Sequence, residues 1–301
     1  MRTASAYAPG HLTGCFEICD SVEDPIMKGS RGVGVSIKQG VYTRVYAEAS
    51  TRMEHTVWIN GKLTRDAVVS ENILNKMLSM ADGPRRLTVE HTVETPLGAG
   101  FGSSGGGAIT LALTLNEVLN LYLSFTEAAQ IAHVAEIECH TGLGTVYAAT
   151  VGGFGCLYHA GGPGVGRSVK YPRSEELSVV YIHFGPISTN RILTDPEMRR
   201  RINEFGGTLV DKLYKDLRPD LFMELSRRFT ENVGLVTPRL RRVLDAADGA
   251  GVTATMAMFG EVAFSLAPSG EAEDIAKVFT EAAKGQQPKI VRVDDQSVRM
   301  I

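Results

Sequence analysis

The segment from Gly98 to Gly107 is the part of the chain whose composition most directly suggests chemistry. It holds six glycines and two serines, and it stands between a strand-like segment and a long apolar stretch. Glycine costs about 0.5–1 kcal/mol relative to alanine in regular structure, so the cluster indicates a backbone that approaches another group closely. A glycine loop at a helix N-terminus directs free N–H groups and the positive end of the helix dipole toward an anion. We therefore expect a phosphate-binding loop, with a merely flexible loop as the alternative.

The type of phosphate loop can be narrowed from the neighbouring residues. A Walker loop requires a lysine, and none occurs between Pro96 and Leu123. Gly100-x-Gly102-x-x-Gly105 matches the dinucleotide-binding fingerprint, which would make the chain an NAD-binding oxidoreductase. That fingerprint also requires a second strand after the helix, and here a second helix follows. The Rossmann interpretation is therefore disfavoured.

Glu136 and His140 form a second group of chemically useful side chains. They are four residues apart near the expected end of a helix, so both should project from one face. The four cysteines, by contrast, contain no Cys-x-x-Cys pair, which gives little support for zinc. We expect Cys15, Cys19, Cys139 and Cys156 to be reduced thiols.

The elements that must position these residues follow from periodicity and turn signals. We expect strands over residues 33–37, 41–47, 56–59, 62–63, 87–93, 177–184, 253–266 and 289–293. Helices are expected over residues 71–80, 108–121, 124–139, 237–249 and 271–283 and within 195–232. Gln39-Gly40 signals a turn, Asn60-Gly61 a type I′ hairpin and Ser124-x-x-Glu127 a capping box. Blocks of strands and blocks of helices predict an α+β fold, with two units over 1–170 and 171–301.

Length and composition exclude several classes of protein. The chain has 301 residues, is 44% hydrophobic and 22% charged, and has a net charge of −3. These values are those of a globular protein and give no support for nucleic-acid binding. No apolar run approaches the roughly 20 residues that span a bilayer, and the first residues lack a signal-peptide core. We expect a cytoplasmic protein that binds neither nucleic acid nor membrane.

Three segments together resemble the motifs of the GHMP small-molecule kinases. Residues 96–106 resemble the second motif, whose pattern is Pro-x-x-x-Gly-Leu-Gly-Ser-Ser-Ala-Ala. Residues 8–14 resemble the first motif, with His11 where many members carry lysine or arginine. Residues 253–260 stand where the third motif belongs and keep only its last glycine.

The departures from these motifs resemble the archaeal pantoate kinases, and the resemblance covers nearly the whole chain. It rests on Ala-Pro-Gly-His at residues 8–11, Gly-Ser-Arg-Gly-Val-Gly at 29–34, Glu136 followed by Thr-Gly-Leu-Gly at 141–144, Gly-Pro-Ile-Ser-Thr at 185–189 and a methionine-rich third motif.

The resemblance implies two α+β halves with ATP bound between them and Mg²⁺ beside its phosphates. The residues implied at the ATP phosphates are Pro96, Gly98, Gly100, Gly102, Ser103, Ser104, Gly105 and Gly106. Ser104 and Glu136 would bind Mg²⁺, which keeps several waters and so needs few protein ligands. A homodimer is common among such kinases and stays open here.

Recognition of a hydroxy-acid acceptor implies a cation for its carboxylate. Arg31 is the first candidate for that contact, with Lys28 and Arg191 as weaker ones, and His140 is a further candidate acceptor ligand. His11 is expected to contact a phosphate or the acceptor in the reaction itself.

Thr145 is the main departure from the family pattern. Many of these kinases carry an aspartate there, which would accept the proton of the acceptor hydroxyl, and threonine cannot act as a base at pH 7. Three accounts stay open. Transfer could rest on positioning and charge stabilisation alone, Asp20 or Glu23 could replace the missing acid, or the protein could have changed substrate or lost activity.

The leading functional hypothesis is ATP-dependent phosphorylation of the primary hydroxyl of a small branched hydroxy acid. The branch resemblance points to pantoate and so to coenzyme A biosynthesis. The main alternative is a kinase for mevalonate 3-phosphate in isoprenoid biosynthesis, which extra basic residues around the acceptor would favour. A nucleotide-binding protein without turnover is the remote alternative.

Overall fold

Two very long strands organise the N-terminal part of the molecule. In the computed structural model, which describes residues 1–301, β1 (Arg2–Cys19) and β2 (Gly29–Ala49) pair antiparallel along nearly their whole length. The register shifts at Pro9/Gly10, opposite the expected turn at Gln39-Gly40. The chain does not turn there, so that expectation was wrong. A Cβ on Gly40 would lie 2.0 Å from the carbonyl oxygen of Ala8, so this glycine permits close approach of two strands.

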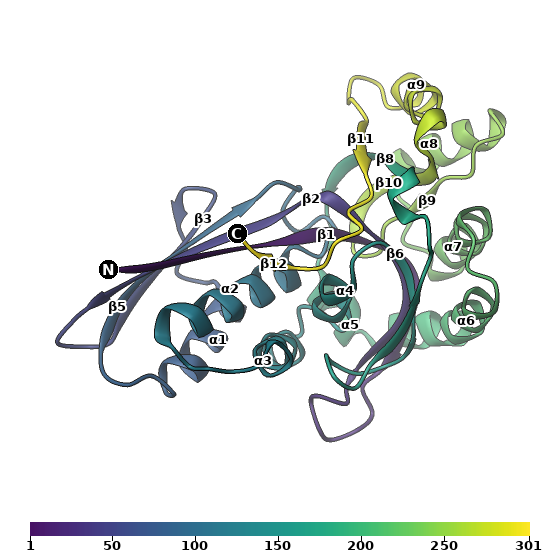
Figure 1. The fold of residues 1–301 in the computed structure, drawn as a ribbon. Helices are drawn as coiled ribbons and strands as arrows, with labels where there is room; N and C mark the ends of the chain where they lie inside the picture. Colours follow the sequence, from purple (N-terminus) through teal and green to yellow (C-terminus); the bar gives the residue numbers. More distant parts are fainter.

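The larger sheet is built around this pair (Figure 1). Its other strands are β3 (Glu54–Ile59), β4 (Lys62–Leu63), β5 (Arg85–Val93), β6 (Phe154–His159), β7 (Arg167–Lys170) and β12 (Arg299–Met300). The order is β12-β1-β2-β5-β3-β4, and β6 pairs with the first part of β2 and then with β7. Asn60 and Gly61 both have positive φ, which confirms the predicted hairpin.

Four helices pack beside this sheet. They are α1 (Val68–Leu78), α2 (Ser103–Leu119), α3 (Phe125–Glu138) and α4 (Thr145–Val151). Helix α2 lies against β1 and β2, and the other three pack against α2. The capping box at Ser124 and Glu127 is confirmed. Helix α2 begins at Ser103, earlier than expected, because glycines inside its first turns allow it to approach β2. A Cβ on Gly106 would lie 3.2 Å from a methyl of Val41.

A second, four-stranded sheet forms the rest of the core. Its order is β11 (Lys289–Arg292), β8 (Leu177–Pro186), β10 (Gly260–Pro268) and β9 (Thr255–Met256). Its helices and connecting turns are η1 (Ser174–Glu176), α5 (Thr189–Thr194), α6 (Pro196–Lys215), α7 (Pro219–Val233), α8 (Pro238–Gly249), η2 (Ser269–Glu271) and α9 (Ala272–Ala282). Helices α8 and α9 pack against this sheet, α6 packs against β1, and α7 packs against β1 and also against β9 and β10 (Figure 1).

Two apolar clusters fill the molecule, and β1 and β2 enter both. The cluster beneath α1–α3 includes Ala4 and Val45, whereas the larger cluster includes Phe16 and Val35 and residues of the C-terminal sheet. Strand β7 of the larger sheet ends at Lys170, and β8 of the smaller sheet follows, but β12 returns to the larger sheet. The larger cluster takes residues from both sides of residue 170, so the division into two units stays a prediction. The α+β class expected from the sequence is confirmed.

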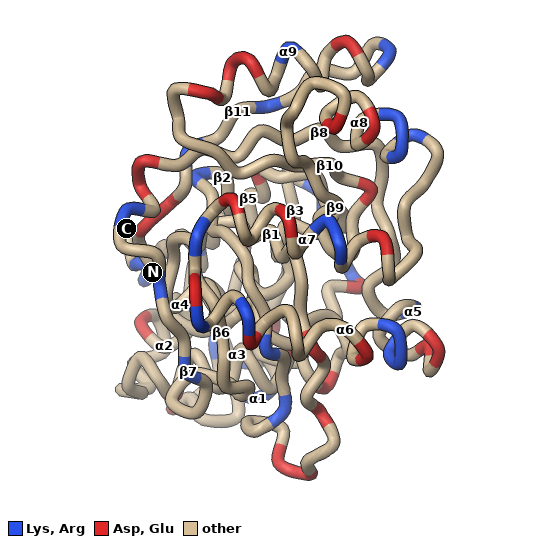
Figure 2. Tube along the Cα trace, turned by 90° about the vertical axis from the view of Figure 1, so that its right-hand side faces the viewer, with Lys and Arg blue, Asp and Glu red and all other residues tan.

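Charged residues lie mainly on the outer helices and loops, with both signs interspersed, as Figure 2 shows for α6, α8 and α9. None of the helices combines the length and the apolar character that crossing a bilayer requires.

Candidate active site

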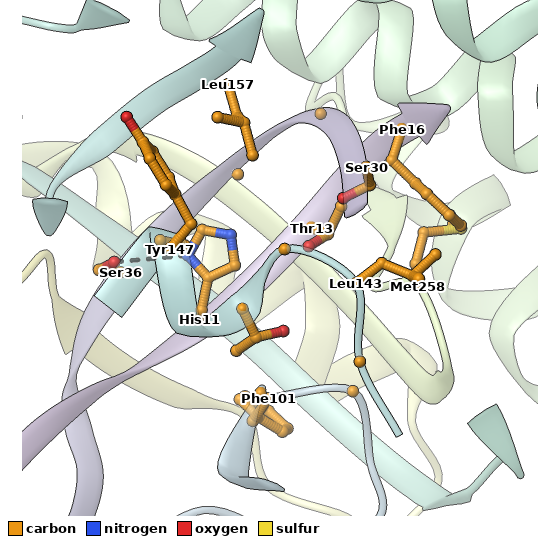
Figure 3. Close-up of a pocket in the computed structure, with 18 of the residues that line it drawn as sticks. His11, Thr13, Phe16, Ser30, Ser36, Phe101, Leu143, Tyr147, Leu157 and Met258 are labelled. Carbon is orange, nitrogen blue, oxygen red and sulfur yellow. Dashed lines mark hydrogen bonds between the residues drawn. The ribbon is translucent and has the colours of Figure 1, made fainter. Parts of the chain in front are cut away.

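The three motif segments meet around one cavity of about 230 Å³. Strand β1 contributes His11 and Thr13, the glycine loop contributes residues 98–104, and the turn before β10 contributes Met258 and Phe259. The loop between α3 and α4, helix α4 itself, strands β2, β6 and β7, and Thr189 of α5 complete the wall. Figure 3 shows side chains from these separate elements converging on one space. Segments more than two hundred residues apart in the sequence therefore form one site.

The glycine loop owes its shape to left-handed backbone and to contact with the third motif. Gly98, Gly100 and Gly102 have φ of 69°, 77° and 65°. A Cβ on Gly100 would lie 2.4 Å from the carbonyl oxygen of Met258, and one on Gly260 would lie 1.8 Å from that of Ala99. The single glycine that the third motif keeps is thus the one on which the loop rests.

The N-terminus of α2 opens onto the cavity as a set of free donors. No side chain caps this helix, and its first complete turn is closed by the Gly106 N–H, which donates to Gly102 O at 3.0 Å. The N–H groups of Ser103, Ser104 and Gly105 come before that bond and have no intrahelical acceptor. No acidic residue lies in the first turn to occupy them. Such a set of free donors is suited to an anion, and phosphate binding here stays a prediction.

Five of the eight residues expected at the phosphates line the cavity: Gly98, Gly100, Gly102, Ser103 and Ser104. The other three support the loop or its helix from outside the lining. Gly105 lies against Thr145, Gly106 lies against Val41, and Pro96 stands before the loop.

Glu136 lies directly behind the first turn of α2. Its side chain is almost completely buried, with 2% exposed. Its Oε1 accepts hydrogen bonds from Ser104 Oγ at 2.5 Å and from Thr141 Oγ1 at 2.7 Å. Burial raises the pKa of this carboxyl, and the two hydroxyl donors act in the opposite direction. Both donors therefore hold one oxygen, and the other carboxylate oxygen stays available.

This group of oxygens fits Mg²⁺. Space beside the carboxylate is preserved by Gly142, because a Cβ there would lie 2.1 Å from Glu136 Oε2. Carboxylate and hydroxyl oxygens are hard ligands of the type that Mg²⁺ prefers. No cluster of three His, Cys, Asp or Glu residues exists in the chain. A magnesium ion here would therefore need phosphate oxygens and water to complete its coordination.

His11 of the first motif contacts both the glycine loop and strand β2. Its backbone N–H donates to Phe101 O at 2.8 Å, and its Nδ1 lies 3.4 Å from Ser36 Oγ (Figure 3). Its ring lies over Gly34, where a Cβ would come within 2.4 Å of Nε2. Burial lowers the pKa of His11 to about 4, so the ring is neutral near pH 7.

Thr145 begins α4 and faces the glycine loop. Its methyl group would lie 2.5 Å from a Cβ on Gly102, and its own Cβ would lie 2.8 Å from one on Gly105. The structure therefore brings Thr145 into the cavity wall, as expected. The lining contains no carboxylate. Asp20 is bound to Arg199 at 2.6 Å and Glu23 is exposed, so the structure brings neither into the lining as a substitute acid.

The basic residues expected at the acceptor are not brought together. Arg31 pairs with Glu17 at 3.4 Å and with Asp211 of α6, because alternation along β2 turns it away from the cavity. Lys28 lies outside the lining in the β1–β2 connection, and Arg191 is exposed on α5.

His140 also lies outside the lining. Helix α3 ends at Glu138, so His140 does not continue the helical face of Glu136; it adopts φ of 53° and is exposed. Its conformation turns the chain so that Thr141 returns over Glu136.

Several lining residues were missed from the sequence. Strand β2 places Ser30, Gly32, Gly34 and Ser36 along the cavity, one at every second position. Small residues at the period of a strand mark a face that leaves room for something else, so this signal was available. Thr13 lies inside the first motif but was not singled out. Other missed lining residues, among them Tyr147, Leu157, Ser168 and Thr189, have no local signal.

This chain resembles known proteins that are described as kinases or phosphotransferases. Residues 68–153 match the family model described as the GHMP kinases N terminal domain. The pantoate kinase of Methanocaldococcus jannaschii is 31% identical over 90% of this chain and 96% of its own. The mevalonate kinase of Pyrococcus abyssi is 26% identical over 80% of this chain and 76% of its own. A solved structure described as a phosphotransferase related to the CoA biosynthesis pathway superposes with a TM-score of 0.89 at 27% identity, covering 100% of this chain and 99% of that one.

Proposed function

This chain belongs to the GHMP kinases, among the relatives of pantoate kinase, and we propose that it phosphorylates the primary hydroxyl of pantoate at the expense of ATP. The product is 4-phosphopantoate, a precursor in coenzyme A biosynthesis. The observation that carries the proposal is that the uncapped α2 N-terminus, Ser104 and His11 line one cavity, with Glu136 hydrogen-bonded to Ser104 directly behind it.

The triphosphate occupies the N-terminus of α2. The free N–H groups of Ser103, Ser104 and Gly105 donate to phosphate oxygens, and the helix dipole favours their charge. Ser104 and Glu136 would hold Mg²⁺, which neutralises charge on the phosphate oxygens. The exposed outer side of the loop admits the nucleotide, and the acceptor fills the enclosed part of the cavity along β2, α4 and β6.

In the transfer step the acceptor oxygen bonds to the γ-phosphorus while the bond from that phosphorus to the β–γ bridging oxygen breaks. Phosphoryl transfer through a loose transition state needs little proton abstraction before bond formation. We propose that the site acts by positioning and charge stabilisation, and that the hydroxyl proton leaves through a phosphate oxygen to water. Thr145 then serves as part of the wall that aligns the acceptor with the loop.

The lining disfavours mevalonate 3-phosphate as the acceptor. A phosphorylated acceptor brings at least one further negative charge, and no lysine or arginine lines the cavity. The intact Ser104–Glu136 pair likewise argues against a protein that binds nucleotide without turnover.

A cytoplasmic location fits the use of ATP. A homodimer is a proposal that light scattering would test.

The test is a coupled ADP-release assay with pantoate and mevalonate 3-phosphate side by side, with the product identified by phosphorus NMR. We expect ADP release with pantoate and a phosphomonoester on its primary hydroxyl. ADP release at the acceptor-free rate with pantoate would overturn the proposal.

A further inference from the structure

Every polar side chain along the acceptor part of the cavity is neutral. Hydroxyl groups come from Thr13, Ser30, Ser36, Tyr147 and Ser168, and the imidazole of His11 lies among them. Tyr147 OH lies 3.2 Å from Ser168 Oγ, and Ser36 Oγ lies 3.4 Å from the His11 ring. The walls between these pairs are therefore polar without carrying charge.

The nearest basic side chains are committed elsewhere. Arg31, next to Ser30 on β2, is bound on the opposite side of the strand by Glu17 and Asp211. Lys170 follows Ser168 on β7, but its Nζ donates to the carbonyl of Asp295 at 2.6 Å and pairs with its carboxylate at 2.9 Å. Releasing either cation would leave a carboxylate without its partner.

Apolar groups cover much of the remaining surface. Leu157 of β6 lies on the same side of the cavity as Tyr147, and Phe16, Leu143 and Met258 face it from the other side (Figure 3). A branched carbon of the acceptor can bury methyl groups against these walls.

A carboxylate placed here has hydroxyl donors but no cation, and it shares the space with the triphosphate. Desolvating an unpaired anion is costly, and the neighbouring negative charge increases the cost. Hydroxyl groups can donate to a carboxylate oxygen or to an uncharged carbonyl oxygen, and the stronger bond to the charged oxygen is offset by its larger desolvation cost. The lining therefore distinguishes an acceptor by shape and hydroxyl position and gives little preference to a charged carboxyl group.

We infer that the acceptors of this enzyme are branched primary alcohols recognised through their hydroxyl and acyl oxygens, and that the uncharged primary amide of pantoate is phosphorylated about as well as pantoate. This inference rests on the proposed function and defines its substrate class more closely.

The experiment compares kcat/KM for pantoate and for its primary amide with saturating ATP and Mg²⁺. We expect the two values to lie within a factor of about 30. Losing one partner of a buried charge pair costs at least about 2 kcal/mol, or about 30-fold, so a cation that reads the carboxylate would give pantoate a larger advantage. A preference for pantoate above about 30-fold overturns the inference while leaving the proposed function intact. Absence of turnover with both compounds overturns the proposed function itself.

A matched pair of variants tests whether the assay senses charge at this position. Ser168→Lys introduces a cation into the wall, and Ser168→Met introduces a side chain of similar length without charge. We expect the ratio of pantoate to amide kcat/KM to rise at least 10-fold in Ser168→Lys and to stay near the wild-type ratio in Ser168→Met. The inference places the acyl group of the acceptor beside the Tyr147–Ser168 hydroxyl pair. An unchanged ratio in Ser168→Lys would contradict that placement.

Discussion

At the scale of single residues, the site depends on one buried carboxylate with two hydroxyl donors on the same oxygen. Ser104 comes from α2 and Thr141 from the loop after α3, so Glu136 is held between two elements. The side chain forms no ion pair, and these two hydrogen bonds hold its Oε1 in place. Substituting the carboxylate and substituting its hydrogen-bond donors should therefore affect Mg²⁺ binding and activity differently.

Glu136→Gln removes the charge and keeps the shape. We expect kcat/KM for ATP to fall on the order of 10²-fold or more, because a neutral amide is a poor ligand for Mg²⁺. The check is ADP release across a Mg²⁺ titration, together with calorimetric binding of Mg-ATP. Wild-type affinity for Mg-ATP in this variant would exclude Glu136 from the magnesium site.

Thr141→Val removes a support and leaves the carboxylate in place. We expect the Mg²⁺ concentration for half-maximal activity to rise 10- to 100-fold, as when partners of metal ligands are lost. Thr141→Ser keeps the hydroxyl and should restore the wild-type value within a factor of about three. Loss in Thr141→Ser with little loss in Thr141→Val, which keeps the methyl group, would indicate that packing and not the hydroxyl is what matters.

Individual residues also show which parts of the site could be predicted from the sequence. Ser104 and Glu136 were identified because a motif of fixed spacing contains them. Arg31 was placed wrongly because the side of a strand on which a residue falls depends on register, and a slip of one position reverses it. Leu157 and Ser168 reach the cavity only through the pairing of β6 with β2 and β7, which no local pattern encodes.

At the scale of elements, the glycines of the phosphate loop fall into two kinds. Those before α2 have positive φ, and one of them, Gly100, touches the third motif. Gly107 instead lies within the helix, where a Cβ would meet nothing closer than the His91 ring at 3.7 Å. Composition alone gives both kinds the same weight. Their consequences for stability should be opposite.

Gly100→Ala should destabilise the loop, because alanine at φ of 77° is strained and its Cβ would lie 2.4 Å from Met258 O. We expect a loss of about 1–3 kcal/mol in the free energy of unfolding and at least a 10-fold rise in KM for ATP. Gly107→Ala is the control, and we expect it to stabilise α2 by up to about 1 kcal/mol. Chemical denaturation of both variants and steady-state kinetics provide the measurement; equal effects would contradict the distinction.

Turn signals show why elements can be predicted only in part. Asn60-Gly61 gave a hairpin because both residues tolerate positive φ within a two-residue loop. Gln39-Gly40 gave none, because the glycine serves close packing against β1 in a continuous strand. Glycine allows positive φ in a turn at one position and close approach of two strands at the other. The sequence alone does not distinguish these two roles.

At the scale of the whole molecule, β1 and β2 join the two cores. Each strand contributes side chains to the cluster under α1–α3 and to the larger cluster that includes the second sheet. Unfolding of β1 and β2 would therefore expose apolar residues of both clusters at once. The division of the chain near residue 170 is therefore a change of sheet within a shared core.

We expect the protein to unfold in a single transition, with equal calorimetric and van't Hoff enthalpies. The measurement is differential scanning calorimetry of the full chain. Two resolved transitions would show that the halves are independent in spite of the shared strands.

Stability should also fall as the solution becomes acidic. Burial lowers the pKa of His91, and that of His11, to about 4, below the value of 6.5 in an unfolded chain. The unfolded state then binds more protons below pH 6.5, so the free energy of unfolding decreases as the pH falls from 6.5 toward 4. Each histidine should account for about 1.5 kcal/mol between pH 6.5 and 5. Denaturation midpoints across this range should vary less in His91→Gln, and an unchanged slope would contradict the assignment.

The pairing of β12 with β1 has a consequence for how the molecule is made. Ala6 pairs with Met300, and the Ile301 N–H donates to Ser5 O at 2.9 Å, so this ladder joins residues almost three hundred positions apart. During translation the open edge of β1 must wait for its partner until nearly all of these residues have left the ribosome. An unpaired strand edge is a site for aggregation. Yield in a cell should therefore depend on chaperones that shield nascent chains, and a carrier protein fused directly behind Ile301 should reduce the soluble fraction more than one fused ahead of Met1.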